Sequence, residues 1–352
     1  MTADSYSNSS DSPNPSDSPD SPGGRLGRAL ASLRGLAVGD ALGSQFFVPV
    51  NYPLLKRREL PPAPWQWTDD TEMACSVVAV LAAHLRVDQD ALAHSFAQHH
   101  DFDRGYGPAV NRLLRLVREG GDWRELSAAL FNGRGSWGNG AAMRIAPLGA
   151  WYADDPEQAT HQAEISAYPT HQHREGVVGA MAVAAAAALA AAPGGPPSAE
   201  ALLDGVIALV PKSAVGTGLR RARDMLDYAD AGTVAAVLGC GRRTTAHDTV
   251  PFALWSAARG LGDYAQVLDH RAGRRGHGHH LRHRGRRDRR REGRDAACRV
   301  GGADGGAAGL GADGCLTPPT FRPAVPPARE GNSLCSPGTL RDRPAVVLAA
   351  AV

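Results

Sequence analysis

The sequence is poor in aromatic residues, in cysteine pairs and in strand-like patterns. Phe, Trp and Tyr make up 6% of its 352 residues, and no segment sustains the alternation of apolar and polar residues that a half-buried strand requires. The five cysteines are an odd number without metal-ligand spacing, which argues against a disulfide framework and against a zinc site. Since no secretory apolar core follows the N-terminus either, we expect reduced thiols and a cytoplasmic protein.

Long apolar runs and a strong net charge are also missing. The alanine-dominated stretch 177–192 is too short and too weakly apolar for a membrane span, so we interpret it as the central buried helix of a bundle and expect no membrane partner. A net charge of +2 predicts no strongly charged partner. With 43% apolar residues and abundant alanine and glycine, the chain can form close-packed helices around a sizeable core.

Composition divides the chain into three parts. Residues 1–24 are mostly Ser, Pro, Asp, Asn and Gly and are predicted to be a disordered tail, because they cannot bury enough apolar surface to offset their ordering entropy. Residues 25–266 are predicted to form one compact, multi-helix, all-α domain. Residues 267–352 are rich in Arg, Gly, Ala and Pro and are predicted to be largely irregular. After an N-terminal helical run, further helices are expected at 68–86, 89–99, 110–117, 122–130, 177–192, 199–210, 218–228, 233–238 and 250–259.

The most informative stretch is 67–73, Trp-Thr-Asp-Asp-Thr-Glu-Met. Asp69 and Asp70 directly precede an apolar run at helical spacing, so they fall in the first turn of a helix, where free N–H groups and the helix dipole favour anions. A plain cap, with Asp69 capping and Glu72 completing a capping box, explains one acid but not two acids between threonines. Hydroxyl and carboxylate oxygens at a rigid helix start suit a hard cation such as magnesium, manganese or calcium.

Three further motifs accompany these acids. Residues 39–43 (Gly-Asp-Ala-Leu-Gly) close an earlier helical run; the helix dipole disfavours Asp40 at a C-terminal end, which predicts a compensating partner. Residues 138–144 (Gly-Asn-Gly-Ala-Ala-Met-Arg) let backbone N–H groups approach a ligand, and Thr-His follows at 170–171. Structural roles are open alternatives: Asp40 as a hydrogen-bond acceptor, and Arg144 as an ion-pair partner in place of a phosphate contact.

In chain order, the four motifs resemble those of the ADP-ribosylglycohydrolase family over roughly residues 25–266; its bacterial members include the enzyme that reactivates ADP-ribosylated dinitrogenase reductase. The resemblance implies an all-α enzyme that uses two Mg²⁺ or Mn²⁺ ions to hydrolyse the bond between ADP-ribose and a protein side chain or a small acceptor. It implies metal ligation by Thr68, Asp69 and Asp70, the two aspartates being the catalytic pair. It implies substrate contacts at Asp40, Gly138, Asn139, Gly140, Met143 and His171.

The chain departs from the family pattern after Gln266. The second metal motif of the family, Gly-Gly-Asp-Thr-Asp-Thr, is absent. Residues 275–287, read in the frame that joins the last two bases of each codon to the first of the next, permit Gly-Asp-Thr-Asp-Thr-Thr-Cys-Ala-Ile-Val-Gly-Gly-Val. We infer a frameshift near residues 265–267 that removes half of the metal ligands and impairs activity. The basic tract 271–299 lacks interleaved aromatic residues, so no nucleic-acid partner is expected.

Three alternatives remain open. The chain could be a related α-helical metal hydrolase that acts on another N-glycoside or on a phosphate ester. It could be a non-catalytic relative that keeps the fold for a structural role, as the crystallin members of the family do. It could also be an ADP-ribose-binding remnant, because half of the metal ligands are missing. Binding of manganese and of ADP-ribose, each measured separately from turnover, discriminates between these alternatives.

Overall fold

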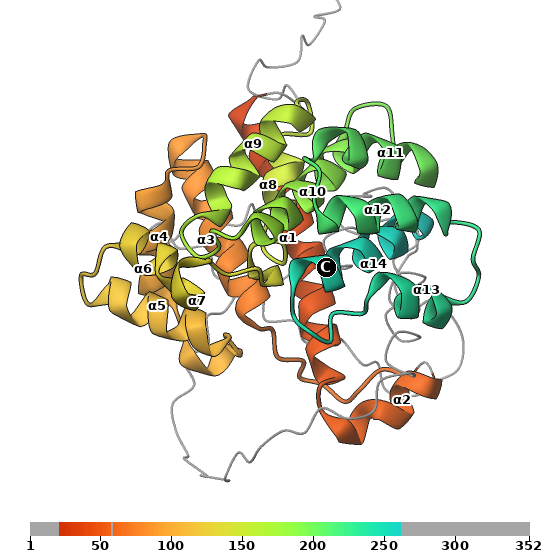
Figure 1. Ribbon diagram of the computed structural model, residues 1–352, viewed down its shortest axis with the longest axis horizontal. Helices are drawn as coiled ribbons and strands as arrows, with labels where there is room; N and C mark the ends of the chain where they lie inside the picture. The colour runs from red at the N-terminus through yellow and green to blue at the C-terminus, as the bar shows by residue number, and fades with distance from the viewer. Residues whose placement is uncertain (1–20, 58, 262–352) are drawn as a thin grey trace, which may run out of the picture.

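Helices make up the regular structure of the part of the chain that the computed structural model describes, residues 21–57 and 59–261 (Figure 1). Within these ranges no strand forms, although an isolated bridge pairs Gly138 with Thr245, so the all-α prediction is confirmed. The helices are α1 (Pro22–Gln45), α2 (Tyr52–Arg57), α3 (Asp69–His84), α4 (Gln89–His99), α5 (Pro108–Arg118), α6 (Trp123–Ala128), α7 (Leu130–Gly133), α8 (Ala146–Trp151), α9 (Pro156–Ala167), α10 (Arg174–Ala191), α11 (Ala199–Leu209), α12 (Ala214–Asp224), α13 (Ala231–Leu238) and α14 (Ala246–Arg259). Short 3₁₀ segments are η2 (Pro49–Asn51), η3 (Phe102–Arg104) and η4 (Asn139–Ala141).

Most of the predicted N-terminal tail, and all of residues 267–352, lie outside the described residues. The first helix nevertheless begins earlier than the expected start at Arg25. Pro22 opens α1, and the side chain of Ser21 caps it by accepting a hydrogen bond from the N–H of Gly24 at 3.1 Å. A serine cap followed by proline is a favoured helix start, so the end of the Ser/Pro-rich segment serves as the cap of this helix.

The centre of the bundle is α10, which packs against α8 and α9, and against α11 and α14 (Figure 1). Residues 182–188 have no exposed surface. By length and composition this 18-residue helix is sufficient to cross a membrane, so the prediction that it is too short is wrong. Of its residues, 72% are buried inside the protein, as the predicted role of a core helix requires. Gly149 of α8 permits the close approach, because a Cβ atom there would lie 2.3 Å from the carbonyl oxygen of Ala184.

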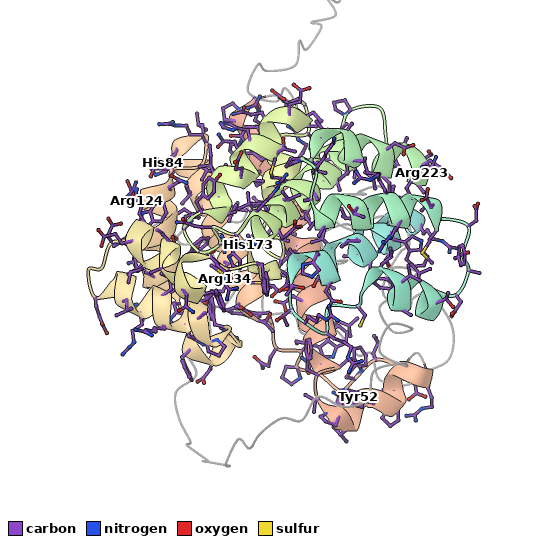
Figure 2. The ribbon with its side chains drawn as sticks, in the orientation of Figure 1. Tyr52, His84, Arg124, Arg134, His173 and Arg223 are labelled. Carbon is purple, nitrogen blue, oxygen red and sulfur yellow. The ribbon has the colours of Figure 1, made fainter. Side chains whose placement is uncertain are left out.

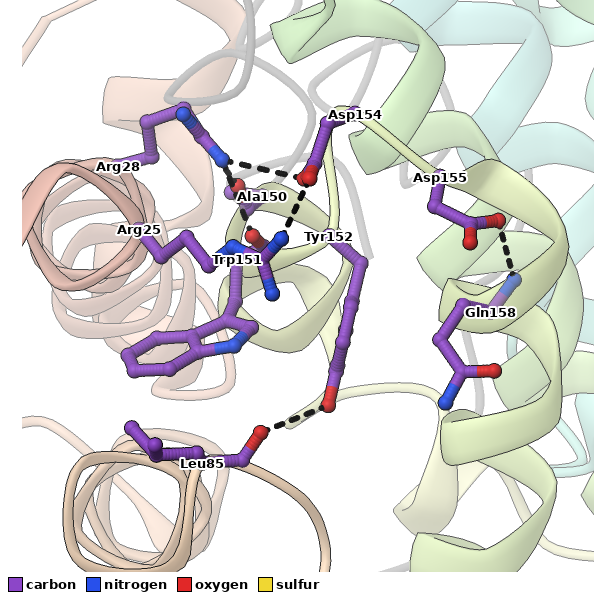
Figure 3. A network of polar contacts seen from close by, with 9 residues as sticks. All are labelled: Arg25, Arg28, Leu85, Ala150, Trp151, Tyr152, Asp154, Asp155 and Gln158. Atoms are coloured by element: carbon purple, nitrogen blue, oxygen red, sulfur yellow. Dashed lines mark hydrogen bonds and ion pairs between the residues drawn. The ribbon is translucent and has the colours of Figure 1, made fainter. Parts of the chain in front are cut away.

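Polar contacts fix α1 along α8 and the turn that follows it (Figure 3). Arg25 and Arg28 both pair with Asp154, with nitrogen–oxygen distances of 2.6 and 3.3 Å. The hydroxyl of Tyr152 donates to the carbonyl oxygen of Leu85 at 3.2 Å, which ties the same turn to the end of α3. Such partly exposed pairs contribute little stability, on the order of 0–1 kcal/mol each, but they set the direction in which the helices dock.

Two helix boundaries differ from the sequence-based prediction in ways that concern the site. The run that was expected to close near residues 39–43 continues to Gln45, because Ala41 and Leu42 extend its buried face. Asp40 therefore lies inside α1 and not at its end. The helix expected at 218–228 is α12, which begins at Ala214, where Ser213 caps it and Glu175 of α10 accepts hydrogen bonds from its first N–H groups.

Candidate functional site

The acidic stretch starts α3, and Thr68 is its cap. The Thr68 side chain accepts a hydrogen bond from the N–H of Asp70 at 3.4 Å, while Asp69, Asp70 and Glu72 occupy the first turn. An acid-rich first turn is stabilised by the helix dipole. The alternative capping box with Asp69 as the cap is excluded, because Thr68 fills that position and Glu72 is engaged elsewhere. The side chains of Asp69 and Asp70 are half-buried.

Asp40 joins α1 to this helix start. One of its carboxylate oxygens accepts from the Thr68 hydroxyl at 2.6 Å, and the other accepts from the Thr68 N–H at 2.7 Å and from the Thr71 hydroxyl at 2.6 Å. Burial raises the pKa of Asp40, and the hydrogen bonds from Thr68 and Thr71 oppose part of that rise. The predicted compensating partner therefore exists, and the predicted substrate-binding residue serves as a structural acceptor next to the acids.

Asp69 is a carboxyl group in an unfavourable environment. Burial, followed by the negative charge of Asp40, raises its pKa to about 7. The backbone at Gly105 approaches its carboxylate: a Cβ atom at Gly105, where φ is +95°, would lie 3.9 Å from Asp69 Oδ1. Two neighbouring carboxylates with so little solvent favour either a proton or a cation between them.

A loop around η3 covers the start of α3, and Glu72 holds it there. The Glu72 carboxylate accepts from the Tyr106 hydroxyl at 2.7 Å and from the N–H of Asp101 at 3.1 Å. The guanidinium of Arg104 lies 3.4 Å from the ring centroid of Trp67 and pairs with Asp101 at 3.2 Å. Trp67 and Arg104 thus form a wall beside the acids, which the sequence did not predict because it requires the tertiary contact.

The predicted glycine loop forms η4 and is held by the segment before α14. Asn139 donates its N–H to the carbonyl oxygen of Thr244 at 3.0 Å, and Ala246 donates to the carbonyl oxygen of Trp137 at 3.0 Å. Figure 2 shows Arg134 of the same loop and His173, the cap of α10, next to each other in that view. The loop packs against the start of α10, since a Cβ atom on Gly176 would lie 2.7 Å from the carbonyl oxygen of Ser136.

His171 lies against the glycines of this loop. A Cβ atom would lie 3.3 Å from its Nε2 if placed at Gly138, and 2.8 Å from its Cε1 if placed at Gly140. Nδ1 of the ring is 2.7 Å from the Thr170 hydroxyl. Burial, together with the positive charge of Arg144, lowers the pKa of His171 to about 3, so the ring is neutral at pH 7. Met143 Sδ also contacts the loop, 4.0 Å from the same Gly140 position.

Arg144 connects the two groups of residues. Its side chain is fully buried and donates to the carbonyl oxygen of Ser166 at 2.9 Å and to Met73 Sδ at 3.5 Å. Its guanidinium carbon lies 4.5 Å from the ring centroid of Phe96. Its charge lowers the pKa of both Asp69 and His171. With no exposed surface it does not serve as a phosphate contact, and it forms no ion pair among the described residues. Both alternatives for this residue are therefore corrected: it is a buried cation of the core.

The predicted site residues thus fall into two groups that share Arg144 as a neighbour. The first group contains Asp40, Thr68, Asp69 and Asp70. The second contains Gly138, Asn139, Gly140, Met143 and His171. Within the described ranges, no set of three or more His, Cys, Asp or Glu side chains is arranged to hold a metal ion. The oxygens of Thr68, Asp69 and Asp70 have the chemistry of hard-cation ligands, and they amount to one side of such a site.

Sequence reasoning did not assign a role to two aromatic residues on the N-terminal side of the glycine loop, Phe131 in α7 and Trp137 directly before Gly138. Phe131 is 51% exposed and Trp137 is 49% exposed. The Trp137 ring makes T-shaped contacts with the rings of His173 and His247. The distances between ring centroids are 5.4 and 6.4 Å, respectively. Exposed aromatic rings beside a glycine loop offer surfaces on which a nucleobase can stack. Because aromatic residues are scarce in this chain, two of them within seven positions of a glycine-rich stretch are a signal that sequence reasoning could have used.

The fold and site define an all-α protein with an acidic helix start beside a glycine loop, and comparison with known proteins gives its family. The ADP-ribosylglycohydrolase family model matches residues 21–276, which is more than half of the chain and extends past Gln266, where the resemblance was expected to stop. The chain belongs to the ADP-ribosylglycohydrolase family.

The chain is also similar to individual proteins and to a solved structure. ADP-ribosylhydrolase ARH3 of Homo sapiens is 34% identical over 174 residues, which cover 44% of this chain and 48% of that protein. An uncharacterized protein of Archaeoglobus fulgidus is 30% identical over 168 residues, 43% of this chain and 52% of its own. The chain thus spans about half the length of these relatives. A solved ADP-ribosylglycohydrolase-related protein complex covers 71% of this chain and 81% of its own, at 25% identity with a TM-score of 0.47.

Proposed function

We propose that this chain binds ADP-ribose conjugates and that its fold is built to hydrolyse the glycosidic bond between ADP-ribose and a protein side chain or a small acceptor. Family membership supports the reaction class. The observation that carries the proposal is the pairing of an acidic helix start with a glycine loop through one buried arginine, Arg144.

Each group of residues has a distinct part in this proposal. The backbone of η4 and the neutral ring of His171 position the ADP-ribose, since glycine lets the ligand come within hydrogen-bonding distance of the main chain. Phe131 and Trp137 offer their faces to the adenine ring. Asp40 keeps the two threonines and the start of α3 rigid, so that the acids keep their geometry.

A divalent cation, Mg²⁺ or Mn²⁺, completes the site in this proposal. Thr68, Asp69 and Asp70 would hold it, and when bound it would supply charge stabilisation while the anomeric bond breaks. The raised pKa of Asp69 supports a cation there, because the folded chain leaves this carboxyl group short of positive charge. The sequence lacks the second metal motif of the family, so we propose that the 352-residue chain holds the cation weakly and turns over slowly.

The test measures binding and turnover separately. Isothermal titration of the full chain with ADP-ribose, and with Mn²⁺, should give saturable binding for the first and weak binding for the second. Gly140→Ala should weaken ADP-ribose binding at least tenfold, because the new methyl group would lie 2.8 Å from the His171 ring. Asp70→Ala should remove Mn²⁺ binding and leave ADP-ribose binding within about threefold, a difference well under 1.4 kcal/mol.

Binding of ADP-ribose without turnover would favour a second candidate function. The described residues supply only one side of a metal site, which also fits a protein that binds ADP-ribose without cleaving it. Saturable ADP-ribose binding with no Mn²⁺-dependent release from an ADP-ribosylated peptide would assign that role. Absence of ADP-ribose binding by the wild-type chain, with its helix content intact, would contradict both functions.

A further inference from the structure

A cavity of about 510 Å³ lies outside the residues assigned so far. It is bounded by α12, by the end of α13, by the loop after α13 and by the start of α14, which lie together on one side of the molecule (Figure 1). Its volume is in the range of small-molecule sites. The side chains that give it polar character are Thr217, Arg221, Arg243, His247 and Asp248.

The charges that line this cavity do not balance. Asp248 is engaged in the loop itself: its Oδ2 accepts from the N–H of Arg243 at 2.9 Å, and its Oδ1 lies 2.5 Å from the position of a Cβ atom on Gly239. Among the described residues, the guanidinium groups of Arg221 and Arg243 have neither an ion-pair partner nor a hydrogen-bond partner. By contrast, Arg223 on the same helix pairs with Asp204 at 3.1 Å.

His247 adds a polar atom that lacks a partner. Its Nδ1 is buried and makes no hydrogen bond to the described residues. Two guanidinium groups and an imidazole form a donor-rich lining, and only one carboxylate opposes it. The Thr217 hydroxyl adds no free donor, because it already donates to the carbonyl oxygen of Ser213 at 3.0 Å. Such a lining suits a phosphate group, which arginine can bind through two parallel hydrogen bonds.

The cavity adjoins the glycine loop through His247. This residue lines the cavity, and its ring meets the ring of Trp137 with 6.4 Å between centroids. The residue before it, Ala246, donates its N–H to the carbonyl oxygen of Trp137 at 3.0 Å. A ligand whose adenine stacks on Trp137 therefore has its adenosine end next to the cavity.

We propose that this cavity is a second anion subsite, which takes a phosphate group carried on the adenosine side of an ADP-ribose ligand. The inference rests on the proposed function, because adenine is placed at Trp137. It names a substrate class: ADP-ribose that bears a further phosphate on its adenosine ribose. Arg221 and Arg243 bind that phosphate, and they leave the rest of the ligand to the glycine loop.

The experiment compares ADP-ribose with ADP-ribose 2′-phosphate by isothermal titration of the full chain. The 2′-phosphate ligand should bind at least tenfold more tightly. The double variant Arg221→Gln/Arg243→Gln should lose that advantage and keep the affinity for ADP-ribose. The matched control Arg220→Gln/Arg242→Gln removes the same charge from adjacent positions that do not line the cavity, and it should keep the advantage.

Equal affinity of the wild-type chain for the two ligands would overturn this inference and leave the proposed function standing. Equal loss in both double variants would also overturn it, because the effect would then be one of general charge. Failure of both ligands to bind would instead overturn the proposed function. In that case inorganic phosphate is the probe: a shift of the His247 ring resonance that Arg221→Gln/Arg243→Gln abolishes supports the cavity as an anion site, and no shift overturns it.

Discussion

Asp69 shows how much stability this protein gives up at a single residue. Its carboxyl group is partly buried beside Asp40, and burial and that charge raise its pKa to about 7. The folded chain therefore binds a proton at this group more readily than the unfolded chain does. Between the ordinary pKa of an aspartate and about 7, stability falls as pH rises, because in that range the folded state keeps a proton that the unfolded state has already lost.

This leads to a prediction about pH and cation. In the presence of a chelator, Asp69→Asn should raise the free energy of unfolding at pH 8 by about 1–2 kcal/mol, a value reduced from the full shift to allow for solvent screening. At pH 4 the two proteins should be equally stable within error. Urea unfolding at both pH values is the measurement, and a variant that is less stable than wild type at pH 8 contradicts the prediction. Mn²⁺ should stabilise the wild type more than the variant.

At the residue scale, the sequence predicted the acids but not their surroundings. Asp69 and Asp70 stand out because two carboxylates before an apolar helical run exceed what a cap requires. The role of Arg144 was not predictable, because its burial depends on Met73, Phe96 and Ser166, which are far from it in the sequence. Glu72 likewise matched a local capping box, while its actual partner, Tyr106, lies across the fold.

At the scale of elements, local signals were reliable where a helix carries its own cap. α4 begins and ends where the spacing predicts, because Asp88 caps it by accepting from the N–H of Ala91. α9 was missed, although Asp155 and Pro156 are a regular helix start, because its buried face is built from small residues such as Ala159 and Ala163. Alanine gives a weak apolar signal in a sequence, yet it suits a close helix contact.

The close contact between α8 and α10 leads to a prediction about Gly149. Gly149→Ala should lower the free energy of unfolding by about 2–3 kcal/mol, because its Cβ atom would lie 2.3 Å from the backbone oxygen of Ala184, which cannot move without α10. Gly27→Ala is the matched control: Gly27 is an exposed position in α1 with nothing within 4 Å of an added Cβ. The control should be neutral or stabilising by up to about 1 kcal/mol. Equal unfolding midpoints for the two variants would contradict the proposed α8–α10 contact.

At the scale of the whole molecule, the two groups of site residues come from the first 171 residues. The family model continues to residue 276, and the sequence beyond it carries no Gly-Gly-Asp-Thr-Asp-Thr motif. The all-α character of the described part and most of its helices were predictable from helical spacing, whereas α2, α8 and α9 were not. The absence of this motif was visible only because a resemblance to the family defined what to look for.

A protein with a restored reading frame tests whether the absent motif accounts for weak metal binding. Reopening the reading frame near Ala265 should restore that motif, and with it both tight Mn²⁺ binding and metal-dependent release of ADP-ribose from an ADP-ribosylated peptide. The encoded 352-residue chain should bind Mn²⁺ at least tenfold more weakly, a loss of about 1.4 kcal/mol or more, because it lacks opposing anionic ligands. Full metal-dependent turnover by the chain as encoded would refute the idea, as would a gene whose shifted frame does not encode the motif.

The position of α10 also has a consequence for biosynthesis. This helix leaves the ribosome before α11 and α14, two of the helices that cover it, have been made. Until then its outer faces are bare, and by length and composition it resembles a segment bound for a membrane. The native arrangement cannot close before α14 has emerged, so a stalled or truncated chain that ends within α11 exposes an apolar helix that targeting factors and chaperones are built to recognise.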